Sequence, residues 1–242
     1  MVASFDPQAA RDITFIPVGI NYDRVLEDRI LVAAASTAHG EKPVFGFSAG
    51  RLIRFMGGHV WRSLMGRNYR YGYACVSFGD PVSLKAYLAR ASFDFRTLPS
   101  GERFGAVEKL GRELMIAVGR VIPALPVSLA ATAFLDAGDL PLTAFELKAR
   151  VAALIDRLEA SGAHVHIPRA DRDYAIDVGL RMLTLRHFVI EDAGNFRANP
   201  TETAMLTYYA NAIAHLLIPP DPIQQDANRS VELFPQQAPA MV

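Results

Sequence analysis

The sequence has almost no cysteine and no net charge. Cys75 is the single thiol among 242 residues, so no disulfide can form within the chain. This excludes a disulfide-stapled secreted scaffold and favours a reducing compartment such as the cytosol. The 25 Lys and Arg residues balance the 25 Asp and Glu residues, so the molecule as a whole does not attract nucleic acid.

Long uninterrupted hydrophobic runs and common nucleotide or hydrolase motifs are also absent. Residues 1–12 carry acids and lack the apolar core of a signal peptide, so we expect no export. The most apolar stretch, residues 114–135, contains Arg120 and is broken by Pro123 and Pro126, which predicts a buried or membrane-grazing helix pair rather than a membrane span. No P-loop, G-x-G-x-x-G or G-x-S-x-G sequence occurs.

The hydrophobic spacing that is present predicts a mixed α/β chain. Residues 12–20 are apolar on both faces, which is typical of a strand buried inside a mixed sheet, and Pro17 indicates either the C-terminal end of that strand or an edge position. A second strand is expected at 69–78, and a hairpin at 188–198 that turns at Ala193–Asn195. Helical spacing occurs in six segments: 21–35, 82–91, 102–121, 143–161 with a Thr143–Glu146 capping box, 172–186 and 201–217.

A basic segment without acids separates the first helix from the second strand. No Asp or Glu occurs between Lys42 and Gly79, and Trp, Phe, Leu and Met are interleaved with five arginines: Arg51, Arg54, Arg62, Arg67 and Arg70. Guanidinium groups beside apolar side chains suit contact with anionic lipid or with a phosphorylated substrate. A solvated basic face explains the same composition, and contact with nucleic acid is a weaker third interpretation.

Candidate catalytic residues are few. His166 and Asp171 have the His-x4-Asp spacing in which a carboxylate orients an imidazole that acts as general base, although a chance match is readily expected. His164 and His166 lack a third ligand at a suitable spacing, so no metal site and no cofactor are predicted. The helix near the C-terminal end carries Tyr208, Tyr209, Asn211 and His215, for which hydrogen-bonded packing is the favoured interpretation over a functional role.

A DNA-binding interpretation of residues 143–198 also has to be weighed. The succession of two helices and a hairpin resembles a winged helix. Basic and acidic residues are equal in number over this segment, which argues against binding to a polyanion. No nucleic-acid partner is therefore predicted.

Four blocks resemble the bacterial membrane-bound glycerol-3-phosphate 1-O-acyltransferases, in the same order along the chain. They are ITFIPVGINYDRVLED at 13–28, YACVSFGDPVSLKAYL at 73–88, VIPALPVSLAATAFL at 121–135 and LTYYANAIAHLLIPP at 206–220. The last block is the most specific. In that family the His-x4-Asp motif and the blocks that hold glycerol-3-phosphate precede the strand resembled by residues 13–18. His166 and Asp171 lie downstream, in the wrong order for that motif, so the chain resembles the C-terminal part of such an enzyme.

The resemblance implies a domain organisation. Residues 1–92 would be the C-terminal part of the acyltransferase α/β domain, residues 93–220 a mostly helical domain with a small β-hairpin, and residues 221–242 a disordered Pro- and Gln-rich tail. The family's fourth block contributes to acyl-chain binding, which here corresponds to Ile16, Pro17 and Val18. The apolar Phe15 adjoins them, and a core strand remains the alternative.

The resemblance also implies substrates, partners and a location. They are glycerol-3-phosphate, acyl-CoA or acyl-carrier protein, and an anionic membrane surface at the cytoplasmic face of the inner membrane. A truncated reading frame, an excised segment or a split protein with a separate N-terminal catalytic half would each produce such a C-terminal part. The isolated chain is then expected to be inactive. A non-catalytic interaction or regulatory domain derived from such an enzyme is the alternative function.

Overall fold

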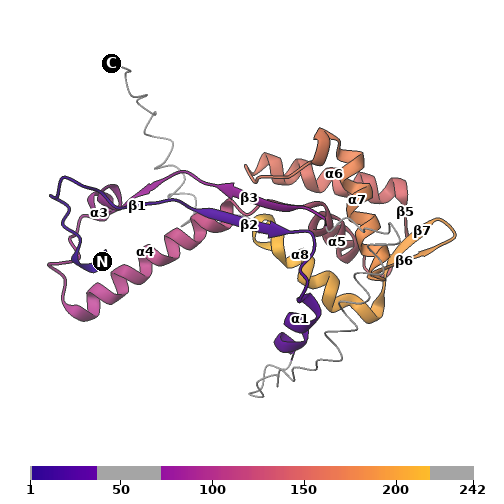
Figure 1. The fold of residues 1–242 in the computed structure, drawn as a ribbon, viewed down its shortest axis with the longest axis horizontal. Helices are drawn as coiled ribbons and strands as arrows, with labels where there is room; N and C mark the ends of the chain where they lie inside the picture. The colour runs from indigo at the N-terminus through magenta and orange to yellow at the C-terminus, as the bar shows by residue number, and fades with distance from the viewer. Residues whose placement is uncertain (1, 37–71, 219–242) are drawn as a thin grey trace, which may run out of the picture.

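A long antiparallel ribbon lies along one helix and leads into a helical domain. The computed structural model describes residues 2–36 and 72–218. Two strand pairs form the ribbon: β1 (Thr14–Phe15) with β4 (Val82–Ser83), and β2 (Val18–Tyr22) with β3 (Ala74–Phe78). The Gly79 N–H donates to the Pro17 carbonyl at 2.9 Å, which joins the two pairs. In Figure 1 the ribbon runs beside the long helix α4 towards the helices on the right.

Seven α-helices and a second small sheet make up most of the remaining described structure. The helices are α1 (Asp28–Ser36), α3 (Leu84–Ala91), α4 (Ser100–Arg120), α5 (Pro126–Ala137), α6 (Ala144–Ala160), α7 (Arg172–Leu185) and α8 (Thr203–Leu217). Three 3₁₀ turns are η1 (Val2–Ser4), η2 (Pro168–Ala170) and η3 (Pro200–Glu202). The second sheet has the order β5-β7-β6, with β5 (Leu142–Thr143), β6 (Val189–Asp192) and β7 (Asn195–Ala198).

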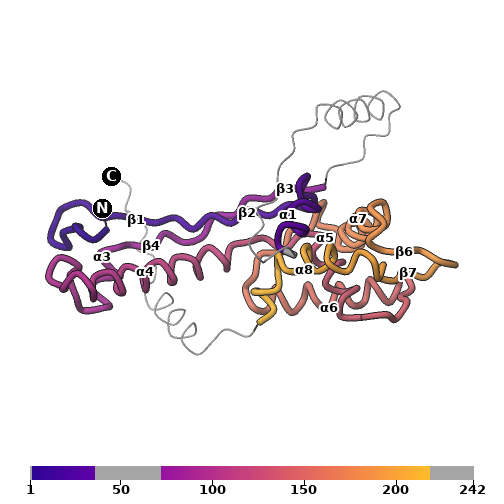
Figure 2. Tube along the Cα trace, turned by 90° about the horizontal axis from the view of Figure 1, so that it is seen from below, coloured from indigo at the N-terminus to yellow at the C-terminus, as the bar shows by residue number. Residues whose placement is uncertain are grey.

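Helix α5 is the centre of the main hydrophobic core. It begins with Pro126, which lacks the N–H that the first turn of a helix leaves unpaired, and nearly all of its residues are buried. Helices α6, α7 and α8 pack around it, as the tube in Figure 2 shows. A Cβ at Gly179 of α7 would lie 2.4 Å from the Pro126 carbonyl oxygen, so the close crossing of α5 and α7 requires glycine there.

A second, smaller core lies at the far end of the ribbon. It is formed by Phe5, Leu84, Tyr87, Leu88, Phe95 and Leu110, with Phe15 among the partly buried residues that pack against it. Because Leu110 belongs to α4, that helix shares a core with residues that precede residue 92. Helix α4 therefore connects the ribbon to the helical domain.

The mixed α/β class and several local elements are confirmed. Thr143 and Glu146 form the expected capping box, with both reciprocal hydrogen bonds present. The hairpin turns at Ala193 and Gly194, which both have positive φ as a two-residue hairpin turn requires. Among residues 2–36 and 72–218, no helix combines the length and hydropathy needed to cross a bilayer.

Two expectations for the N-terminal segment are wrong. Residues 12–20 are not buried on both faces: Ile16 is 57% exposed, and Val18 and Ile20 are also exposed, because the ribbon has two strands and elements within residues 2–36 and 72–218 cover only one of its faces. The first helix begins at Asp28 rather than near residue 21, because Asn21 and Tyr22 continue strand β2. The five arginines of the basic segment and the tail at 221–242 lie outside the described residues.

Candidate functional site

The four residues named for acyl binding lie at the joint between β1 and β2. Phe15 is half-buried against the second core, and Pro17 is buried. Ile16 and Val18 are exposed. The structure therefore divides these side chains between the two sides of the ribbon.

One side of the ribbon is an apolar surface that no other element of the described residues covers. Three cross-strand pairs occupy it, Val18 with Phe78, Ile20 with Val76, and Tyr22 with Ala74. The free face is defined here by its large exposed side chains: Ile16, Val18, Ile20, Tyr22, Val76 and Phe78. Helix α4 runs along the ribbon in both views, and it packs against β2 (Figures 1 and 2).

The opposite, covered face of β2 is shaped by the turn that follows α4. A Cβ at Gly19 would lie 2.4 Å from the Val121 carbonyl oxygen, so only glycine permits this approach of two backbones. The Asn21 side-chain amide donates to the Pro123 carbonyl at 2.8 Å. The end of α4 is thereby fixed on the ribbon.

Asp23 is a buried carboxylate at the N-terminus of α5. It is 1% exposed and accepts hydrogen bonds from two backbone N–H groups, those of Tyr73 and Val127, both at 3.0 Å. The Val127 N–H belongs to the first turn of α5, where the helix dipole favours a negative charge. Burial nevertheless raises the pKa of Asp23 above its ordinary value, and the two N–H groups oppose that effect.

His166 and Asp171 are not joined by a hydrogen bond in the described part of the chain. The Asp171 carboxylate instead accepts from the Tyr174 N–H at 3.0 Å and caps α7. The His166 ring lies 5.1 Å from the Tyr73 ring between centroids, and its Nε2 is buried without a hydrogen-bond partner among the described residues. Burial, with a smaller effect of His164, lowers the pKa of His166 and favours the neutral imidazole.

The backbone between these two residues is strained. Arg169 and Ala170 both have positive φ, at 60° and 54°, a region that residues with a Cβ seldom occupy. The Arg169 guanidinium lies 4.2 Å from the centre of the Tyr174 ring, over its face. The segment therefore turns sharply before α7 begins.

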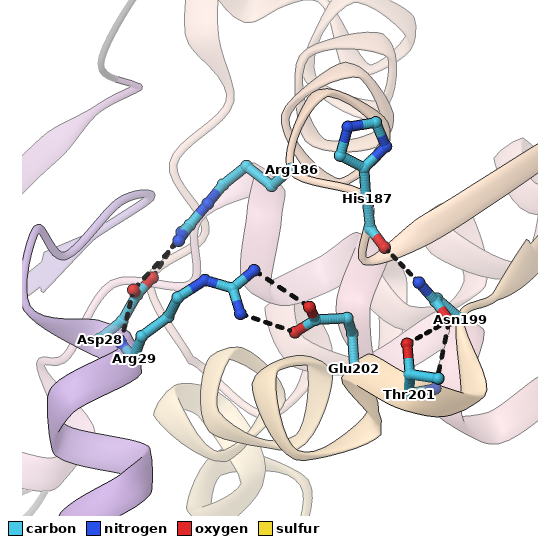
Figure 3. Close-up of polar contacts among 7 residues, drawn as sticks. All are labelled: Asp28, Arg29, Arg186, His187, Asn199, Thr201 and Glu202. Atoms are coloured by element: carbon cyan, nitrogen blue, oxygen red, sulfur yellow. Dashed lines mark hydrogen bonds and ion pairs between the residues drawn. The ribbon is translucent and has the colours of Figure 1, made fainter. Parts of the chain in front are cut away.

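A buried ionic cluster joins α1 to the helical domain. Asp28 is 1% exposed and is bound by both terminal nitrogens of Arg186, at 2.5 and 3.0 Å (Figure 3). The Tyr209 hydroxyl donates to Asp28 and accepts from Arg186 at 2.7 Å. The Arg186 guanidinium also lies 4.5 Å from the centre of the buried Phe188 ring. One ion pair thus holds together α1, the end of α7 and α8.

The protonation states of the cluster follow from these contacts. Burial disfavours the ionised Asp28, but hydrogen bonds from Arg186 and Tyr209 outweigh it and hold the pKa of Asp28 below its ordinary value. Burial and the hydrogen bond to Asp28 raise the pKa of Tyr209 to about 12. Asp28 is therefore ionised and Tyr209 neutral near pH 7.

A second ion pair on α1 is exposed. Arg29 binds Glu202 with two nitrogens, at 3.1 and 3.2 Å, and the Arg29 side chain is 58% exposed (Figure 3). The Asn199 side chain donates to the His187 carbonyl and caps η3, which leads into α8. The Arg29–Glu202 pair holds the start of α8 against α1.

Sequence reasoning named only part of this cluster. Tyr209 is buried and hydrogen-bonded, in agreement with the packing interpretation of the C-terminal helix. His215 Nε2 lies 2.9 Å from the Gly119 carbonyl oxygen. Asn211 is exposed. The pairing of Asp28 with Arg186 had no sequence signal, because 158 residues separate them. In the described ranges, no three His, Cys, Asp or Glu side chains gather closely enough to share a metal ion.

The structure consists of a β-ribbon and a helical domain that buried polar contacts join, so the protein is of the mixed α/β class. Residues 59–223, about two thirds of the 242-residue chain, match the family model of the glycerol-3-phosphate acyltransferase C-terminal region. The chain belongs to this family. The matched region contains three of the four resembling blocks, and the block at 13–28 precedes it.

Proposed function

We propose that this chain supplies the C-terminal part of an enzyme that acylates glycerol-3-phosphate in phospholipid biosynthesis. The observation that carries the proposal is the family match over residues 59–223. Glycerol-3-phosphate and an acyl donor are the substrates that this family implies. The donor in our proposal is a thioester, either acyl-CoA or acyl-carrier protein.

The proposed reaction needs a base near the substrate hydroxyl. The hydroxyl oxygen attacks the thioester carbonyl, a C–O ester bond forms, the C–S bond breaks, and the hydroxyl proton passes through the base to the leaving thiolate. His166 is a poor candidate because its Nε2 is buried and Asp171 caps α7 instead of orienting the ring. We therefore assign the base to the N-terminal catalytic part of the enzyme and expect this chain alone to be inactive.

The same chain would contribute to acyl and membrane binding. The exposed Ile16 and Val18 support the assignment of residues 15–18 to an acyl-binding wall, since an acyl tail needs apolar surface.

The basic segment with Arg51, Arg54 and Arg62 would hold the enzyme peripherally at the cytoplasmic face of the inner membrane. Vesicle sedimentation should weaken with added salt and when these three arginines are changed to Gln. Equal binding to neutral and anionic vesicles would contradict the electrostatic part.

The runner-up function is a non-catalytic interaction or regulatory domain. It is favoured by one observation, the lack of a hydrogen-bonded base and carboxylate at His166 and Asp171 among the described residues. An activity assay separates the two functions, because only the acyltransferase function predicts that a catalytic half needs this chain for turnover.

The test is an assay with glycerol-3-phosphate and a long-chain acyl-CoA. We expect background turnover from the purified chain and turnover above background when a family catalytic half is added. Turnover by the chain alone that disappears with His166→Ala, and persists with the matched control His164→Ala, would assign the base to His166.

In the complete enzyme, Ile16→Asp should raise the apparent KM for the acyl donor without lowering the melting temperature. Destabilisation with unaltered KM would refute the acyl-site assignment.

A further inference from the structure

The cross-strand register places Phe78 beside the residues assigned to acyl binding. Phe78 of β3 is the direct partner of Val18 of β2, and the Gly79 N–H that follows it donates to the Pro17 carbonyl at 2.9 Å. Directly opposed side chains on one face of an antiparallel pair lie close enough to contact each other. Phe78 is 72% exposed, more than any other side chain of the free face. An acyl tail in contact with Val18 would therefore also contact Phe78.

We propose that the acyl tail lies lengthwise along the whole free face, with Phe78 and Val76 of β3 forming the second row of its binding wall. This inference rests on the proposed function and adds residues that the resemblance did not assign. The first row consists of Ile16 and Val18, which the resemblance did assign, and of Ile20. Alternate residues of a strand share one face, so both rows point to the same side of the ribbon.

The length and the chemistry of the free face both fit an acyl tail. Ile16 and Tyr22 are six residues apart in the sequence, which corresponds to about 20 Å at about 3.3 Å per residue. One acyl layer of a bilayer is about 15 Å deep, half of the hydrocarbon core of about 30 Å, so one tail fits along the face. Strands β2 and β3 carry no charged residue, so no charge has to be desolvated when an uncharged tail binds.

The surroundings of the two ends give the tail a direction. Beyond Tyr22 the surface remains apolar, because Leu26 and Ile30, just before and within α1, are exposed at that end of the ribbon (Figure 1). Beyond Phe78 the chain becomes polar at the exposed Asp80. The methyl end of the tail therefore lies at Tyr22 and the thioester at Phe78.

The test uses two photoreactive acyl-CoA probes on the full chain. Both are palmitoyl-CoA analogues with a diazirine, one next to the thioester and one next to the methyl end, and both are used below the concentration at which they form micelles. Mass spectrometry locates the labelled residues. We expect the thioester-end probe to label the chain around Ile16 and Phe78, and the methyl-end probe to label it around Tyr22. Excess palmitoyl-CoA should abolish this labelling, whereas free CoA should not.

Two exposed phenylalanines provide a matched pair of variants. Phe78 lies on the free face, and Phe145, which is 81% exposed, lies at the start of α6. Phe145→Gln should be labelled like the wild type. Phe78→Gln should lower labelling at Tyr22 by the methyl-end probe about tenfold, since the bound tail would bury the amide without a partner. Melting temperatures of the three chains should agree within a few degrees, and Phe78→Thr, which keeps a strand-forming residue, should lower labelling similarly if Phe78→Gln unfolds.

Several outcomes would overturn the proposal. They are an unlabelled free face, the same or the reverse positions for the two probes, and unchanged labelling of Phe78→Gln. Labelling of the free face by a diazirine phospholipid in vesicles but not by the acyl-CoA probes would assign the face to membrane lipid instead.

Failure of the proposed function would look different. Ordered labelling that depends on Phe78, without acyl transfer to glycerol-3-phosphate by the complete enzyme, would support the binding wall and contradict the enzymatic role. Acyl transfer with an unchanged KM for the acyl donor in Phe78→Gln would do the reverse.

Discussion

Removing the buried charge of Asp28 should destabilise the chain more than any change to the neighbouring exposed ion pair. Asp28→Asn leaves the Arg186 guanidinium without its anion and places an amide where two donors point. Breaking one partner of a buried pair costs about 3–5 kcal/mol. The Arg186 side chain is 20% exposed and so is partly hydrated, which places the expected loss of unfolding free energy near ~3 kcal/mol.

The matched control is the exposed ion pair of Arg29, the residue that follows Asp28 on α1. Glu202→Gln removes the anion from Arg29, whose exposed position limits the expected loss of unfolding free energy to below ~1 kcal/mol. Urea denaturation of both variants gives the two free energies directly. Equal losses for Asp28→Asn and Glu202→Gln would refute the argument from burial.

The pH dependence supplies a second check on the same cluster. The pKa of Asp28 is lowered on folding, so its stabilising contribution is present above the unfolded value of about 3.9 and is lost as the pH falls through the folded value. The difference between wild type and Asp28→Asn should therefore be constant from about pH 5 to 8 and shrink in acid. A difference that persists unchanged well below pH 4 would contradict the assignment of the effect to the ionised carboxylate.

Three further changes test other parts of the structure. Gly19→Ala should cost about 3 kcal/mol of unfolding free energy, because its Cβ would meet the Val121 backbone. The control Gly105→Ala, on the open side of α4, should stabilise the chain by up to ~1 kcal/mol. Equal effects of the two variants in urea denaturation would refute the close approach at Gly19. Because folding lowers the pKa of His166, the folded state loses stability as the pH falls below about 6.5. His166→Phe should therefore weaken the dependence of the melting temperature on pH between pH 7 and 5. An unchanged dependence would exclude His166 as its cause. Thr143→Ala removes one side of the capping box and should cost ~1 kcal/mol, and a neutral result would show that the first turn of α6 is held by its packing alone.

The sequence predicted elements whose causes are local. The Thr143 capping box needs only residues 143–146, and the hairpin turn needs Gly194 between two short strands. The long apolar spacing of residues 102–121 likewise matches α4 to within about two residues at its start. In each case the residues that determine the structure are neighbours in the chain.

The sequence did not predict features that depend on distant partners. Residues 12–20 are apolar on both faces, which usually indicates burial, yet one side of the ribbon is uncovered. The start of α1 was misplaced because β2 continues through Tyr22, paired with Ala74 some fifty residues away. The roles of Asp23 and Asp28 follow from contacts with residues more than a hundred positions downstream.

The four blocks that carry the resemblance meet at one place, the end of β2. Within eight residues of the first block, Asn21 binds the Pro123 carbonyl, Asp23 binds the Val127 N–H, and Asp28 binds the Tyr209 hydroxyl. Pro123 and Val127 belong to the third block and Tyr209 to the last, and the second block supplies the Tyr73 N–H to Asp23.

These contacts give the blocks a structural role that does not require a catalytic residue. They tie the ribbon to α5 and α8 through buried polar groups, so the free face is held in a fixed orientation to the helical core. Loosening this junction, as Asp28→Asn should do, is therefore expected to reduce the order of the ribbon as well, even though Asp28 lies away from the free face.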